Sequence, residues 1–134
     1  ATESFPQWKG EYWANRTLNG APDLVRNDRD LDFSWEKRAP AANLPIDNFS
    51  ARWTRRVRFF EDSYRFYVHA DDGVKVYIDG KKVLDEWHNS EGKVYSFIRR
   101  MDGKHNLEVK FFENVGDARL RFWWTRIRDL PLPR

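Results

Sequence analysis

The sequence predicts an all-β fold, an antiparallel β-sandwich or barrel. First, apolar residues alternate with polar ones at every second position in several segments, the pattern of strands with one face in a core. Second, turn signals recur between these segments, about ten residues apart. Third, 16% of the residues are aromatic, and aromatic side chains fill β cores. Short strands with regularly spaced turns are typical of sandwiches and barrels.

The elements follow in order along the chain. The first third is less regular, with a turn at residues 19–22 and an extended loop at 39–45. Five alternating segments come next, and each should bury one set of side chains. These sets are Phe49, Ala51 and Trp53; Tyr64, Phe66, Val68 and Ala70; Val74, Val76 and Ile78; Leu107, Val109 and Phe111; and Leu120, Phe122 and Trp124. Turns are predicted at residues 72–73, 79–80, 91–92, 102–103 and 116–117.

The length of 134 residues fits one domain with its own core. We expect that core over residues 8–124, with a proline-containing linker at 128–134. The chain has no apolar run near 18 residues and no signal-peptide pattern, so we expect no membrane insertion. Its start and end suggest a monomeric module cut from a longer, multidomain protein.

Composition argues against several functions. The chain has no cysteine, so neither a disulfide nor a thiolate site is available. The three histidines lack zinc-site spacing, and no nucleophile elbow or phosphate loop occurs. The net charge of +3 is small, and the cluster of Arg52, Arg55, Arg56 and Arg58 has the pattern of a solvated strand face. We therefore expect a non-catalytic protein that does not bind nucleic acid.

The adjacent acids Asp71 and Asp72 are the most informative local feature. In an extended chain, neighbouring side chains point to opposite sides, so a sharp bend is needed to aim both carboxylates at one point. Calcium, which takes six to eight oxygen ligands, would hold two such carboxylates together. A second loop must then supply more oxygens, and residues 113–117 offer an amide side chain and free carbonyls. The alternative is that Asp71, Asp72 and Gly73 merely close a hairpin.

A series of motifs in a fixed order resembles the PA14 domain family, a group of secreted β-sandwich modules. The motifs are YWAN at residues 12–15, LNGAP at 18–22, RND at 26–28, LDFSW at 31–35, DNFSARWT at 47–54, YRF at 64–66, DDGVKVYIDG at 71–80, DEWH at 85–88, FFEN at 111–114 and GDA at 116–118. They cover about residues 8 to 124. The resemblance therefore implies a PA14-type fold for nearly the whole chain.

The resemblance also implies a metal site. In sugar-binding members of the family, two aspartates joined by a cis peptide hold a calcium ion that in turn ligates sugar hydroxyls. By motif these are Asp71 and Asp72. The family's asparagine ligand matches Asn114, and the backbone carbonyls of Gly116 and Ala118 would complete the protein ligands. Asp117 would add a carboxylate or contact the sugar.

Aromatic side chains near turns could stack on a sugar ring. Trp87, His88 and Trp123 are the candidates, because they lie near turns or on the outward phase of a strand. The alternative for Trp87 is packing in the core.

The functional prediction is thus a non-catalytic, calcium-dependent carbohydrate-binding module of an extracellular or cell-surface protein. Its partner would be a glycan, whose hydroxyls ligate the Ca²⁺. The alternative is a structural or protein-interaction module in which calcium only stabilises loops.

Overall fold

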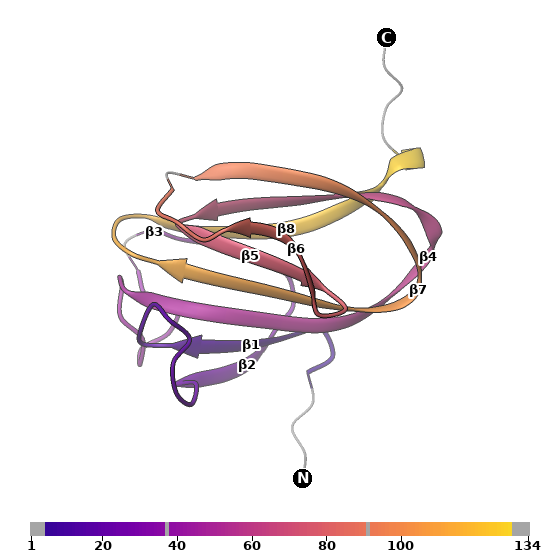
Figure 1. Cartoon of the computed structure of the whole chain (residues 1–134). Helices are drawn as coiled ribbons and strands as arrows, with labels where there is room; N and C mark the ends of the chain where they lie inside the picture. The colour runs from indigo at the N-terminus through magenta and orange to yellow at the C-terminus, as the bar shows by residue number, and fades with distance from the viewer. Residues whose placement is uncertain (1–4, 37, 91, 130–134) are drawn as a thin grey trace.

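The computed structural model describes residues 5–36, 38–90 and 92–129, and these form an antiparallel all-β fold (Figure 1). The fold class predicted from sequence is therefore confirmed. The strands are β1 (Trp8–Trp13), β2 (Leu24–Asp28), β3 (Asp32–Glu36), β4 (Phe49–Asp71), β5 (Gly73–Ile78), β6 (Lys81–Glu86), β7 (Lys93–Glu113) and β8 (Ala118–Arg126). A 3-10 turn, η1 (Ile127–Asp129), follows. The predicted linker thus lies partly in η1, and its residues 130–134 fall outside the described ranges.

The strands form two layers that share β4 and β7. One layer has the order β2-β1-β4-β7-β5-β6. In the other layer, β8 pairs with β3 on one side and with the second half of β4 on the other. Figure 1 shows β4 and β7 curving over at one side of the molecule, so that each strand passes from one layer to the other. The sandwich is therefore one continuous hydrogen-bonded sheet folded on itself.

The length of β4 and β7 differs from the sequence prediction. Two predicted strands, at 49–54 and 64–70, are halves of β4, and the predicted turn at 102–103 lies inside β7. At the fold, the register shifts between Phe59 and Asp62, so that two residues of β4 lie opposite one of β7. Such a bulge bends a strand without ending its ladder. Gly103, opposite Phe59, has a positive φ of 79° that suits the bend.

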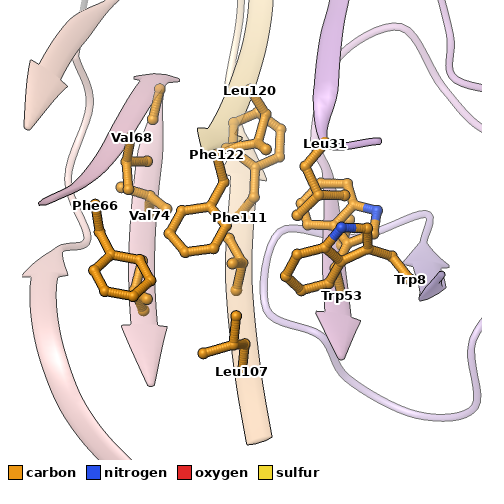
Figure 2. Packing of buried hydrophobic residues seen from close by; sticks show 14 of the residues in the cluster. Trp8, Leu31, Trp53, Phe66, Val68, Val74, Leu107, Phe111, Leu120 and Phe122 are labelled. Carbon is orange, nitrogen blue, oxygen red and sulfur yellow. The ribbon is translucent and has the colours of Figure 1, made fainter. Parts of the chain in front are cut away.

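The predicted alternation places the core correctly. Leu107, Val109 and Phe111 are buried, as are the other predicted sets except for Trp124, which is partly buried. Figure 2 shows this core from close by, with the side chains of Trp53, Phe111, Leu120 and Phe122 among the buried residues between the strands. The core is rich in ring contacts, such as the edge-to-face pair of Trp8 and Phe122 with centroids 5.9 Å apart.

The link at Asp72 does not close a hairpin. It joins β4 to β5, and these two strands do not pair with each other. The second half of β4 lies in one layer, whereas β5 pairs with the last part of β7 in the other layer. Asp72 therefore carries the chain across the sandwich, at the end where β4 and β7 both finish.

Candidate metal centre

Asp71 and Asp72 lie where the chain passes from β4 to β5, close to the β6–β7 loop and to the end of β7. The peptide bond between them is cis. Asp72 is buried, and its carboxylate accepts hydrogen bonds from the backbone N–H groups of Ser90 (3.0 Å) and Asn114 (2.8 Å). Its own N–H donates to the carbonyl of Phe112 (3.3 Å). One side chain thus joins the β6–β7 loop to the end of β7.

Glu113 completes a group of three carboxylates. It is the last residue of β7 and its side chain is 0% exposed. One oxygen each of Asp71, Asp72 and Glu113 lie within 4.8 Å of one another. Both carboxyl oxygens of Glu113 are buried without a hydrogen-bond partner in the described part of the chain, as is Oδ1 of nearby Asp47.

The electrostatics of this acidic cluster, defined as Asp71, Asp72 and Glu113, are unfavourable for the protein alone. Burial raises the pKa of Glu113 to about 9, and the charges of the neighbouring aspartates act in the same direction. Desolvation disfavours a charged carboxylate, and like charges nearby add to that penalty. A bound cation would reverse both effects. Converging carboxylate oxygens, of which those of Glu113 have no hydrogen-bond partner among the described residues, fit a hard cation such as calcium.

The loop predicted to complete the site lies beside the cluster. Asn114 donates its backbone N–H to Asp72, while its side-chain Oδ1 accepts a hydrogen bond from Arg16 (2.8 Å). Gly116 has a positive φ of 94° in the exposed turn, and Ala118 is buried at the start of β8. Asp117 is exposed. Ligation by these residues stays a prediction.

Trp87 lies near the cluster. It is half-buried and packs on Phe112, with ring centroids 4.7 Å apart, and the Nζ of Lys75 lies 4.9 Å from its ring centre. Trp87 and Phe112 line a small cavity of about 200 Å³ together with Arg16 and Thr17.

His88 and Trp123 have different surroundings. His88 is exposed, and its hydrogen bonds to the carbonyl of Asn89 and to Glu86 raise its pKa. Trp123 stacks on Tyr67 on the outer face of β8, four residues beyond Arg119, which pairs with Asp71. Four residues along a strand span about 13 Å. Trp123 is thus not adjacent to the cluster.

Sequence reasoning missed Glu113 as a site residue. A signal was available, because Glu113 continues the alternation of Leu107, Val109 and Phe111 onto the buried face of β7. A carboxylate at a core-facing position of a strand costs folding free energy unless a hydrogen-bond donor or a cation pairs with it. Asp47 and Ser90 lie in loops without such a period, so nothing in their local pattern places them here.

Comparison with known proteins identifies the chain's relatives. The family model described as PA14 domain matches residues 7–130. Anti-sigma-I factor RsgI3 of Acetivibrio thermocellus is 28% identical over 120 residues, which are 87% of this chain and 18% of the relative. A solved anti-sigma factor domain-containing protein has a TM-score of 0.86 at 26% identity, covering 96% of this chain and 50% of its own. Another, from Clostridium clariflavum, has a TM-score of 0.81 at 28% identity, covering 92% and 43%.

These relatives correct the leading functional prediction. The three are described as anti-sigma proteins rather than as carbohydrate-binding proteins. The prediction of a calcium-dependent, lectin-like carbohydrate-binding module, made from the resemblance to sugar-binding family members, is therefore wrong. The chain spans half or less of the length of each relative. No helix in the described ranges is long and apolar enough to cross a membrane.

Proposed function

Since this chain belongs to the PA14 domain family, we propose that it is a non-catalytic structural and interaction module of a larger regulatory protein of the anti-sigma factor kind. The likeness to RsgI3 and to two solved anti-sigma proteins supports the regulatory context. As the sequence motifs lead us to expect, the module would lie outside the cell or at its surface. Its partner would be another protein segment.

Calcium has a structural role in this proposal. The acidic cluster would hold the ion, with Asn114 and the carbonyls of Gly116 and Ala118 as further candidate ligands. The observation that carries this step is Glu113, whose two buried oxygens have no partner in the described residues although it lies within reach of two aspartates. Because Asp72 already joins two loops, an ion bound beside it would stiffen the end of the sandwich where β4, β7 and the β6–β7 loop meet.

Calorimetry with and without calcium tests the proposal. Calcium at a hundred times its Kd should raise the free energy of unfolding by about 2.7 kcal/mol, and the melting temperature by several degrees. EDTA should reverse the rise. Glu113→Gln keeps the side-chain shape but loses the negative charge and one carboxylate oxygen, so it should remove most of the calcium response. Asp85→Asn is the matched control, because Asp85 is an exposed acid that pairs with Lys82.

A glycan array run in calcium and then in EDTA separates this role from sugar recognition. We expect no calcium-dependent binding to any glycan. An unchanged melting temperature in calcium would contradict the structural role of the ion, and EDTA-sensitive glycan binding would contradict the assignment as an interaction module for protein.

A further inference from the structure

One edge of the sandwich is long and unpaired. Residues 93–101, the first half of β7, pair with β4 on one side, and no described strand pairs with them on the other. In Figure 1 this half of β7 forms the upper margin of the molecule, with no labelled strand beyond it. The other edge strands, β2, β3 and β6, have 5, 5 and 6 residues. The edge at 93–101, with nine residues, is therefore the longest that a partner strand could pair with.

This β7 edge lacks most of the devices that protect natural edge strands. Proteins guard an edge with proline, with a bulge, with a very short strand or with charged side chains such as lysine, and the β7 edge has only the last of these. Residues 93–101 contain no proline or glycine, and the bulge begins only after Met101. Val94 and Ile98 are 55% and 44% exposed, although both are apolar. An edge strand with apolar side chains in solvent has the properties of a surface that pairs with another strand.

The charge of the β7 edge indicates which kind of strand would pair with it. The β7 edge carries three cations, Lys93, Arg99 and Arg100, and no acid. Lys93 and Arg99 lie over rings of the same strand, with 5.9 Å to the Tyr95 ring and 5.6 Å to the Phe97 ring. Arg100 pairs with Glu61, but both side chains are more than 60% exposed, so solvent screens that pair. The edge therefore favours a negatively charged partner.

A second copy of the chain fits this edge poorly. Antiparallel pairing of two such edges would bring six cations together without an acid among them, and like charges across a ladder are destabilising. An acidic segment has the opposite effect, since each of its carboxylates meets a cation.

We propose that residues 93–101 of β7 accept an extended, acidic peptide segment of a partner protein as an added strand. The inference rests on the proposed function, because it gives the interaction module its surface and its class of partner. Backbone hydrogen bonds along β7 would supply affinity, and Lys93, Arg99 and Arg100 would select for acidic residues.

Two designed peptides test the proposal on the whole chain in calcium. Both have nine residues, blocked ends and alternating valine and threonine; one carries three glutamates and the other three lysines at the same positions. The glutamate peptide should bind at least about tenfold more tightly, the sum of three modest charge pairs. On binding, freely exchanging amides within residues 93–101 should become protected from hydrogen exchange.

Variants locate the binding. Arg99→Glu with Arg100→Glu should weaken the glutamate peptide about tenfold. The matched control is Lys81→Glu with Lys82→Glu, which changes net charge equally on the exposed edge strand β6 and should leave binding unchanged. Equal affinity for both peptides, no protection within 93–101, or self-association through this edge at rising protein concentration would each overturn the proposal. The calcium response of the melting temperature depends on the acidic cluster and not on the β7 edge. The calcium proposal and the peptide proposal can therefore fail independently.

Discussion

Gly73 shows how one residue sets the geometry beside the acidic cluster. It is the first residue of β5 and pairs with Phe112. A Cβ atom at this position would lie only 2.0 Å from Cε1 of Phe112, and within 2.8 Å of two more atoms of the same ring. The ring of Phe112 thus occupies the space of the missing side chain, and it packs on Trp87 from there.

Gly73→Ala should destabilise the protein, because the buried Phe112 ring must move. Overpacking of this kind costs about 1–3 kcal/mol, which urea unfolding would measure. Phe112→Leu in the same chain should restore part of the loss, since the smaller side chain can yield. Gly80→Asn is the control, because Gly80 has no atom within 4 Å of a Cβ and asparagine tolerates its positive φ. If the Gly73→Ala protein were as stable as the original, the Phe112 ring would have room for a Cβ atom at residue 73, which would contradict the tight packing of this ring.

At this scale, the sequence predicts those residues whose chemistry is unusual for their position. Asp71 and Asp72 stand out because adjacent acids in a strand are unfavourable, and the structure places both in the cluster. Glu113 could have been predicted as well, because it occupies a core-facing position in the alternation of β7. Asp47 could not, because it lies in the loop before β4, where no alternation marks a buried position. The roles of Asn114, Gly116 and Ala118 as ligands rest on the resemblance and stay predictions.

Among the elements, the β5–β6 hairpin illustrates how a turn is tied to the sheet. Asp79 and Gly80 form its two-residue turn, both with positive φ, as the sequence predicts. The carboxylate of Asp79 accepts a hydrogen bond from the N–H of Asn106 (2.8 Å) and contacts Nδ1 of His105 (2.5 Å). The turn is thereby fastened to the middle of β7.

The contact between His105 and Asp79 should make stability depend on pH. The hydrogen bond to Asp79 raises the pKa of His105 above its usual 6.5, and the same bond lowers the pKa of Asp79 below 3.8. The stabilisation is therefore complete between about pH 4 and 6.5. It is lost as pH rises through the raised pKa of His105 or falls through the lowered pKa of Asp79. The nearby charges of Asp102 and Arg56 act in the same directions.

His105→Gln tests this dependence. The difference in unfolding free energy between the original and the variant should be about 1 kcal/mol or less at pH 5–6 and should shrink by pH 9. Asp79→Asn, alone and in the His105→Gln chain, completes a double-mutant cycle that isolates the pair. A difference that stays constant from pH 5 to pH 9 would exclude an ionic contribution.

The lengths of β4 and β7 could not be predicted from the sequence. Local alternation identifies the buried face of each half of β4 correctly, because burial follows the period of two. It cannot show that two halves are one strand, since the bulge at Phe60 and Glu61 has no glycine or proline to mark it. The sequence predicts a turn between strands at residues 102–103, whereas Gly103 bends β7 without ending it.

In the whole molecule, shared strands join the two layers into one unit. Buried residues of β4 occur in both layers, with Trp53 in the first half and Phe66 in the second. If β4 or β7 unfolded, both layers would lose a strand. The all-β class was predictable because five segments after the first third repeat the same period of two, whereas this sharing depends on contacts between distant residues.

Unfolding in urea should therefore be a single transition. Far-ultraviolet circular dichroism and tryptophan fluorescence should give coincident curves, with an m-value of about 1–3 kcal/mol/M. Buried amides of β1 and of β8, which lie in different layers, should exchange with the same free energy of opening. Two separate transitions, or a clearly lower value for one layer, would show that the layers unfold independently.

The two ladders of β4 also form a mechanical path through the molecule. The first strand, β1, is hydrogen-bonded to the first half of β4, and the last strand, β8, to its second half. Tension between the two ends of the domain would pass from β1 into β4 and on to β8 through these backbone bonds. Asp71 is the last residue of β4, next to Arg119 of β8. Lys9 pairs with Thr54 and Arg126 pairs with Tyr64, so tension would load the middle of β4, around its bulge. The acidic cluster lies at the far end of the β4–β8 ladder and would therefore be shielded from that load.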